Sequence, residues 1–390
     1  MTYNFDEQIN REGTNSVKHG LKEKLFGRND IIPMWVADMD FKAPDCVSEA
    51  IQERAKHQIY GYSFRPDTFY QSAVDWMARR HQWNIQPSWI CFLSGIVTGV
   101  NLSILVFTQP GDKVMIQPPV YFPFFEGIKK NNRTLVENRL VLENGRYQID
   151  FNDFEKQLQS GVKLFILSNP HNPGGNVWTR EELRKMGELC IKYDTLIISD
   201  EIHGDIVFPP NKYQPMASVS EEIANHTITF IAPSKTFNIA GLASSVSVIS
   251  NKKLQDKFAH MLDSLHIANG NIFGAVAFEA AYRYGGEWLD QLISYLKQNL
   301  TFLSDYIHQR IDGIQVIQPE GTYLTWMDCR GLPVENDKIH QFMVNEARIG
   351  MNEGASFGQN GIGFERLNFG CPRSVLEKAL GQLESTVNKL

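Results

Sequence analysis

The sequence predicts an α/β protein built on a doubly wound, mostly parallel sheet. Short runs of β-branched and other apolar residues alternate with longer stretches of helical character. The runs are apolar at consecutive positions, which is typical of strands covered by helices on both faces. Strand–helix–strand order with such strands favours parallel pairing through right-handed crossovers. We therefore expect a large central sheet with helices on both sides.

Six apolar runs are predicted to form the strands of this sheet. They are Ile90–Leu93, Lys113–Gln117, Lys163–Ser168, Thr195–Ser199, Thr227–Ala232 and Ser244–Ser250. Between two of them, residues 179–193 are predicted to form a helix, because Thr179 followed by Glu182 makes a capping box. The sheet is therefore expected in the first two-thirds of the chain.

After about residue 250 the pattern changes to long helices followed by short strands. The expected helices are Lys252–Leu265, Ile272–Tyr284, Gly286–Ile311, Lys338–Ala347 and Ser374–Asn388, and the expected strands are Ile314–Gln318, Thr322–Asp328 and Leu367–Phe369. Helices and strands segregated in this way predict a smaller α+β domain. We expect residues 48–285 to form the large domain, and residues 1–47 and 286–390 to form the small one.

The composition excludes several classes of protein. The 390 residues include 38 Lys and Arg against 44 Asp and Glu, a net charge of −6, which argues against nucleic acid as a partner. The five cysteines are scattered without a C-x-x-C pair, so free thiols are expected rather than disulfides or a metal site. The N-terminus is polar, and no apolar run is long enough to span a membrane. We expect a soluble cytoplasmic protein with no membrane partner.

Three polar residues that follow predicted strands carry the chemistry. Asn172, Asp200 and Lys235 come after three strands of the parallel sheet, whose carboxyl ends share one edge. Each is ordinary alone, as a turn residue, a cap or a surface charge. Together they match what pyridoxal 5′-phosphate needs: a lysine for a Schiff base, a carboxylate for the pyridine nitrogen and an amide for the ring hydroxyl.

The segments around these residues resemble a known family. SNPHNPGGNVW, SDEIHGDIVF and APSKTFNIAG look like those of fold-type I pyridoxal-phosphate enzymes of the class I/II aminotransferase superfamily. PMWVADMDF, IYGYSF with RRHQW, QPPVYFPF and FERLNFGCPRSVLEKAL extend the resemblance nearly end to end. More narrowly, the sequence is similar to the cystathionine β-lyase (C–S lyase) branch typified by MalY and PatB.

The resemblance implies roles for five residues around the cofactor ring. Lys235 would form the Schiff base and act as a base, while Asp200 would pair with the pyridine nitrogen and Asn172 with the ring hydroxyl. Tyr121 would stack on the ring, although core packing is an alternative for a tyrosine next to proline and phenylalanine. His203 would bond the ring hydroxyl or Asp200, or else be a core histidine satisfied by the backbone.

The phosphate of the cofactor needs an anion site. Residues 94–98 end a predicted strand and begin an apolar helix, so the backbone N–H groups of Gly95, Ile96 and Val97 suit a phosphate. Ser234, beside the Schiff-base lysine, is a further candidate. Many aminotransferases carry a phosphate-binding arginine where this chain has Ala243, and the lyase branch tends to lack it.

The resemblance also assigns the substrate site and the assembly. Arg366 would hold the substrate α-carboxylate in a bidentate fork, with the backbone around Ala37 nearby; the alternative for Arg366 is a surface salt bridge with Glu365 or Asp328. Tyr62 matches a tyrosine that reaches the phosphate and substrate of the neighbouring subunit, which implies a homodimer with shared active sites.

The implied activity is that of a pyridoxal-phosphate-dependent lyase. It would convert L-cystathionine, or a related S-substituted L-cysteine, into a thiol, pyruvate and ammonia by α,β-elimination. An aminotransferase acting on an amino acid and a 2-oxo acid would use the same residues and is the first alternative. A MalY-like protein that binds a transcriptional activator is the second.

Overall fold

The computed structural model describes residues 2–390 and contains a seven-stranded mixed sheet. The strand order is β2-β10-β9-β8-β7-β3-β4. The bounds are β2 Ile90–Leu93, β3 Lys113–Ile116, β4 Thr134–Glu137, β7 Val162–Ser168, β8 Leu196–Asp200, β9 Thr227–Ile231 and β10 Ser245–Val248. Strands β9, β8, β7, β3 and β4 are parallel, and β10 runs antiparallel to both of its neighbours. The predicted α/β class with a mostly parallel sheet is confirmed.

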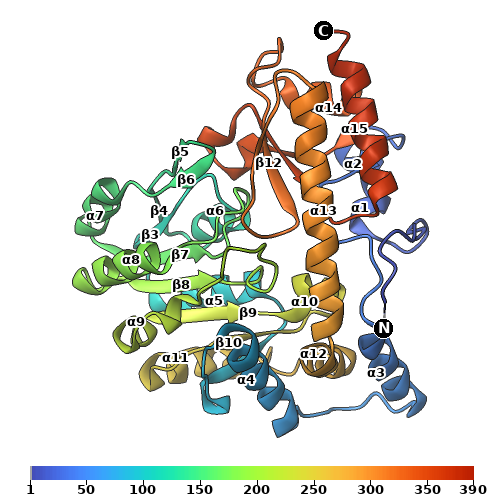
Figure 1. Ribbon diagram of the computed structural model, residues 1–390. Coiled ribbons are helices and arrows are strands. Elements are labelled where there is room, and N and C mark those ends of the chain that lie inside the picture. Colours follow the sequence, from blue (N-terminus) through green and yellow to red (C-terminus); the bar gives the residue numbers. More distant parts are fainter. Residues whose placement is uncertain (1) are drawn as a thin grey trace.

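Helices cover both faces of this sheet (Figure 1). Helix α5 (Ile96–Phe107) packs on one face, whereas α7 (Phe151–Gln159) and α8 (Arg180–Lys192) pack on the other. Strand β7 shows why: Leu164 and Ile166 belong to the core on the α5 side, and Phe165 and Leu167 belong to the core on the α7 and α8 side. Alternate side chains of one apolar strand therefore fill two separate cores.

The predicted capping box begins α8. Thr179 Oγ1 accepts a hydrogen bond from the Glu182 backbone N–H, and the Glu182 carboxylate accepts one from the Thr179 backbone N–H. The other helices are α1 Val17–Gly20, α2 Lys22–Phe26, α3 Asp45–Lys56, α4 Asp67–His81, α6 Pro123–Lys130, α9 Glu221–Asn225, α10 Pro233–Thr236, α11 Lys252–Ser264, α12 Ile272–Tyr284, α13 Gly286–Arg310, α14 Ile339–Asn345 and α15 Arg373–Val387.

The C-terminal part carries a second, antiparallel sheet in the order β11-β12-β15-β14. Its strands are β11 Gln315–Ile317, β12 Leu324–Asp328, β14 Asn352–Glu353 and β15 Phe364–Asn368. The sequence prediction began the last strand at Leu367, which is three residues too late, because Glu365 and Arg366 interrupt the apolar run although both are buried. The long helix α13 runs from α12 up to this sheet and packs against α15 (Figure 1).

The N-terminal segment joins the two parts of the molecule. Strand β1 (Ile32–Pro33) pairs in parallel with β13 (Ile349–Gly350), a contact that the sequence did not predict. The hairpin of β5 (Val141–Glu143) and β6 (Arg146–Gln148) was not predicted either. The division into residues 48–285 against 1–47 and 286–390 stays a prediction. Within residues 2–390, no helix combines the length and the apolar composition needed to cross a membrane.

Candidate active site

The three polar residues singled out after the predicted strands lie around one cavity at the carboxyl edge of the large sheet. Asn172 follows β7, Asp200 ends β8 and Lys235 lies in α10 directly after β9. The cavity has a volume of about 210 Å³. It adjoins the point where the strand order reverses between β3 and β7, which is where open α/β sheets bind ligands. Parallel neighbours therefore bring together residues that are far apart in the sequence.

Lys235 presents a hydrogen-bonded amine to this cavity. Its Nζ donates to the backbone oxygen of Ala37 at 2.6 Å. The backbone around Ala37, predicted to lie near the substrate, is therefore next to Lys235. Burial and the nearby Arg366 charge lower the pKa of Lys235 to about 8, although Asp38 and Asp200 act in the opposite direction. A sizeable fraction of the amine, about one in ten, is then neutral at pH 7.

Asp200 and His203 face the same cavity from the end of β8 and the turn after it. Burial raises the pKa of Asp200 to about 6, partly offset by the Ile202 N–H (3.2 Å) and by Lys235. Burial together with the charges of Lys235 and Arg366 lowers the pKa of His203 to about 3, which keeps the imidazole neutral. Its Nδ1 is buried without a partner among residues 2–390, so the backbone does not satisfy this nitrogen.

Arg366 is a buried cation without a carboxylate partner in the described chain. Its Nη1 donates to Asn172 Oδ1 (2.9 Å), and its Nη2 donates to Trp35 O (2.9 Å) and Asn352 Oδ1 (2.6 Å). Its Nε is buried and unbonded. Burial lowers the pKa of Arg366 to about 10, against the effect of Tyr121 and Tyr323. A buried charge of this kind is costly unless an anion joins it.

The surface salt bridge considered for Arg366 is wrong. Glu365 faces His340 at 3.1 Å, and Asp328 pairs with Arg330 at 2.6 Å. Both carboxylates are therefore used elsewhere, and Arg366 has no carboxylate partner within residues 2–390.

The beginning of α5 forms the corner of the cavity. Gly95 is the N-cap and supplies no side-chain bond, so the first N–H groups of the helix, from Ile96 and Val97 onward, lack a capping acceptor. A Cβ at Gly95 would meet nothing closer than Thr98 Oγ1 at 4.0 Å, which leaves this corner open. Ser234 lines the same cavity, as does Ser244, whose buried Oγ has no partner within residues 2–390. This cluster of donors suits an anion.

Tyr121 lines the cavity and is half-buried, and its side chain also packs against the core on the α5 side. Burial raises its pKa; Arg366 lowers it and Asp200 adds to the rise. Its hydroxyl therefore stays protonated at neutral pH.

Tyr62 is the one predicted site residue that this chain does not bring near the cavity. It is fully exposed, and Ile59, Tyr60 and Phe64 on either side of it are exposed as well. Tyr62 is not among the residues that line the cavity.

Tyr323 was missed by the sequence analysis. Its hydroxyl donates to Ala37 O at 2.8 Å, the same oxygen that binds Lys235, and its buried ring lies 5.9 Å from that of His203. It lies just before β12 and does not follow the end of a predicted strand. Inspecting the residues directly after predicted strands, which located Asn172, Asp200 and Lys235, could therefore not find it. Ser244 could have been found, because it directly follows Ala243, the position singled out for the missing arginine.

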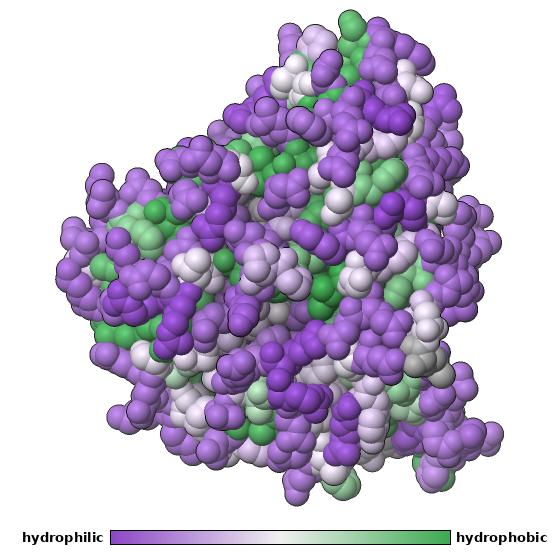
Figure 2. Space-filling model, in the orientation of Figure 1, coloured by the Kyte–Doolittle hydropathy of each residue, from purple (hydrophilic) through white to green (hydrophobic). Residues whose placement is uncertain are grey.

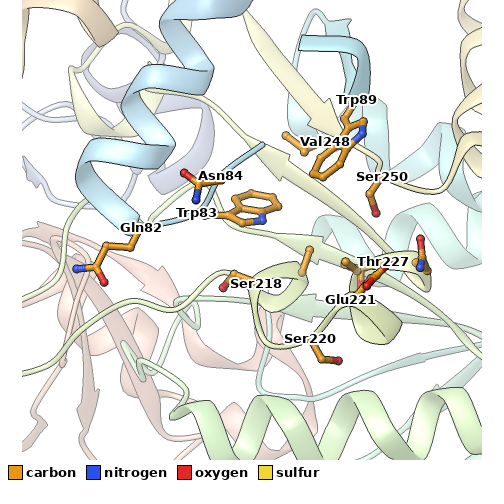
Figure 3. Close-up of a pocket in the computed structure, with 13 residues that line it drawn as sticks. Gln82, Trp83, Asn84, Trp89, Ser218, Ser220, Glu221, Thr227, Val248 and Ser250 are labelled. Carbon is orange, nitrogen blue, oxygen red and sulfur yellow. The ribbon is translucent and has the colours of Figure 1, made fainter. Parts of the chain in front are cut away.

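A second cavity of about 440 Å³ lies at the opposite edge of the sheet (Figure 3). Trp83 and Trp89 flank it, and it reaches the start of β9 at Thr227 and the end of β10 at Val248. None of the predicted site residues lines it. The smaller cavity is the candidate active site, because the groups with shifted pKa values meet there.

Comparisons with known proteins agree with this geometry. The family model described as aminotransferase class I and II matches residues 29–383. Cystathionine β-lyase PatB of Bacillus subtilis (strain 168) is 41% identical over 99% of this chain and 100% of its own. A structure with bound pyridoxal phosphate from Clostridium difficile 630, described as an aminotransferase, is 43% identical with a TM-score of 0.97 over 99% of this chain and 100% of its own. Cystalysin of Treponema denticola, which contains pyridoxal 5′-phosphate, is 36% identical with a TM-score of 0.96 over the full length of both chains.

Proposed function

The chain belongs to the aminotransferase class I and II family, and on that premise we propose that it is a pyridoxal-phosphate-dependent carbon–sulfur lyase. Its substrate would be L-cystathionine or a related S-substituted L-cysteine. The observation that carries the proposal is the buried Arg366, which bonds Asn172, lowers the pKa of Lys235 and has no carboxylate partner in the described chain, together with 41% identity to a cystathionine β-lyase over 99% of the chain. The family resemblance drawn from the sequence is confirmed by these comparisons.

The residues around the cavity fit the cofactor. Two buried polar atoms, His203 Nδ1 and Ser244 Oγ, have no partner within the described chain, as expected for groups that await a polar ligand. Asp200 offers a buried carboxylate for a protonated pyridine nitrogen, which would favour its ionised form. Asn172 uses Oδ1 to bind Arg366, so its NH₂ is the group left to donate to the ring hydroxyl.

The remaining contacts are assigned by position. We place the phosphate at the first N–H groups of α5, with the hydroxyls of Ser234 and Ser244. Lys235 would hold the aldehyde carbon covalently, and Tyr121 would cover one face of the ring.

When bound, pyridoxal phosphate supplies a ring that withdraws electrons and so stabilises negative charge on the substrate Cα. Arg366 binds the α-carboxylate and thereby fixes the orientation of the Cα–H bond. Lys235 then removes the Cα proton with Nζ, which its lowered pKa suits for a base near neutral pH. Asp200 would hold the pyridine nitrogen, and its negative charge would keep a proton on that nitrogen.

The departing sulfur must receive a proton. Tyr121 remains protonated at neutral pH and can donate from its hydroxyl, and Lys235, protonated after the first step, is the other candidate. Overall, the Cα–H, Cβ–S and Cα–N bonds break, and one water supplies the carbonyl oxygen of pyruvate. L-Cystathionine and water thus give homocysteine, pyruvate and ammonia.

Product analysis tests this proposal. The protein, loaded with pyridoxal phosphate, is incubated with L-cystathionine in the presence and absence of a 2-oxo acid. We expect free thiol and pyruvate in equal amounts, independent of the 2-oxo acid. A new amino acid formed only when the 2-oxo acid is present would instead identify an aminotransferase, the activity by which the Clostridium difficile relative is described.

The matched control is Lys235→Ala, which removes the amine and leaves the surrounding hydrogen bonds of Arg366 and Tyr323 in place. Turnover should be abolished in a protein with an unchanged circular dichroism spectrum. Substantial residual turnover would overturn the assignment of Lys235.

We further propose that the active protein is a cytoplasmic homodimer with shared active sites. The exposed Tyr62, carried by a segment with three other exposed apolar side chains, supports this assembly, because such a cluster is covered when another copy binds it. Elsewhere, the face in Figure 2 is largely hydrophilic, with apolar side chains in small scattered groups. Five cysteines without disulfides support a reducing compartment.

A further inference from the structure

A buried carboxylate that the mechanism does not use lies directly behind the candidate active site. Asp205 Oδ1 accepts hydrogen bonds from Trp76 Nε1 (2.9 Å) and faces His81 Nε2 (2.6 Å). Its Oδ2 accepts from Thr236 Oγ1 at 2.7 Å. The Asp205 side chain is only 8% exposed, and that of Thr236 is fully buried. Burial raises the pKa of Asp205, but the bonds from His81, Thr236 and Trp76 outweigh it and hold the pKa below its ordinary value.

Thr236 is the residue after Lys235 in the four-residue helix α10. Lys235 and Ser234 line the cavity, whereas Thr236 points away from it into the core. The Thr236 hydroxyl therefore lies on the side of the lysine-bearing turn that faces away from the cavity, where it can be hydrogen-bonded by the core.

Asp205 belongs to the segment that supplies the other side of the site. Asp200 and His203 precede it and both line the cavity. The bond from Thr236 to Asp205 thus ties the turn that carries the lysine to the segment that carries the pyridine-facing carboxylate. No other side-chain bond between residues 200–205 and α10 is present in the described chain.

Helix α4 makes this tie rigid. Trp76 stacks on Tyr282 with ring centroids 5.2 Å apart and meets Phe237 edge-on at 5.5 Å. His81 lies edge-on to Tyr213 at 4.8 Å. Both donors to Asp205 Oδ1 are therefore held by aromatic packing, and the carboxylate cannot rotate without losing them.

We propose that Asp205 is a positioning residue that, through the Thr236 hydroxyl, fixes Lys235 relative to Asp200. The proposal rests on the proposed function in so far as Lys235 is the lysine that holds the cofactor. Asp205 itself does not line the cavity.

Thr236→Val tests the link, because valine keeps the shape and removes only the hydroxyl. The full-length chain is stripped of cofactor and mixed with pyridoxal phosphate, and the absorbance of the bound form is followed. In this step Lys235 Nζ forms a carbon–nitrogen double bond with the aldehyde carbon, and one water leaves. The matched control is Thr195→Val, which removes an equally buried hydroxyl bonded to Val162 O (2.8 Å). Thr195 directly precedes β8, at the end of that strand opposite Asp200.

A misplaced amine should attach roughly tenfold more slowly in Thr236→Val than in Thr195→Val, although both lose similar thermal stability. In the loaded enzyme, kcat should fall by a similar factor with KM nearly unchanged, because Arg366 is untouched. Thr236→Ser, which restores the hydroxyl, should recover most of the attachment rate. Equal attachment rates in the two valine variants, or a serine variant as slow as valine, would overturn the proposal.

Two further variants keep the result interpretable. If Thr236→Val does not fold, Thr236→Ala tests the same bond, because the smaller alanine side chain leaves room for a water at Asp205 Oδ2. Covalent attachment of pyridoxal phosphate should be slowed to the same extent. Lys235→Ala separates this proposal from the proposed function. Covalent attachment that persists in Lys235→Ala would refute the function assigned to the lysine. Attachment that is lost in Lys235→Ala but proceeds at the parent rate in the Thr236 variants would refute only the positioning role.

Discussion

Replacing Arg366 with lysine tests the most exacting feature of the site. A guanidinium has five N–H donors. Three are used by Asn172, Trp35 and Asn352, which leaves Nε–H and one Nη1–H; a carboxylate bound in a fork would also take one Nη2–H from Trp35 or Asn352. Lysine retains the positive charge but offers a single ammonium group on a flexible chain, so it cannot keep the protein bonds and both substrate bonds together.

The expected loss follows from these bonds. A hydrogen bond to a charged group contributes about 1.5 to 3 kcal/mol. If lysine forfeits one of the two bonds to the carboxylate, kcat/KM for L-cystathionine should fall by about 10- to 150-fold, since each 1.4 kcal/mol is roughly a factor of ten. Most of the loss should appear in KM, because the same bond exists in the bound substrate and in the transition state.

Thiol release measured under initial-rate conditions is the assay, with Arg146→Lys as the matched control. Arg146 is partly buried, is paired with Glu182 and Glu320 and does not line the cavity. We expect its substitution to leave kcat/KM within about twofold of the parent. An Arg366→Lys variant that behaves like Arg146→Lys would refute the assignment of Arg366 to the substrate carboxylate.

Three further predictions concern single buried or exposed groups. Asp200→Ala should lower kcat by at least about 10³-fold in a folded, loaded protein, measured by pyruvate formation, because the negative charge opposite the pyridine nitrogen is lost. Burial raises the pKa of Glu201 to about 7, despite bonds from Ser199 Oγ and Met216 N, so the folded protein should lose on the order of 3 kcal/mol of stability as pH rises from about 4.5 through 7. Glu201→Gln should therefore flatten the fall in Tm between pH 5.5 and pH 8. An unchanged fall would contradict this. Tyr62→Ala should weaken retention of pyridoxal phosphate, measured by equilibrium dialysis, while the dimer persists in sedimentation; full retention would remove Tyr62 from the shared site.

The apolar strands of the large sheet could be predicted because burial on both faces leaves a local signature. Strands β7, β8 and β9 are buried along nearly their whole length, and the sequence shows them as continuous apolar runs. The polar residues directly after them then reach one edge by topology alone, which is why Asn172, Asp200 and Lys235 were located together.

Other parts of the site depend on contacts that leave no local pattern. Strand β15 contains Glu365 and Arg366, and its burial follows from pairing with β12 and β14 rather than from its own hydropathy. Tyr323 and Asp205 act through partners distant in sequence, at Ala37 and at Thr236. Only the folded chain shows these bonds, so residue-by-residue interpretation could not assign them.

The two cations of the site lead to a final consequence for the order of events. Burial and the charge of Arg366 lower the pKa of Lys235, and within residues 2–390 Arg366 has no carboxylate partner to offset its share of that effect. A substrate carboxylate bound at Arg366 would reduce the positive field at Lys235 Nζ and so raise its affinity for a proton. The base would therefore become stronger only when the substrate is oriented for proton removal. Under the proposed function, substrate binding at Arg366 and proton removal at Lys235 would in this way be coupled by a single buried charge.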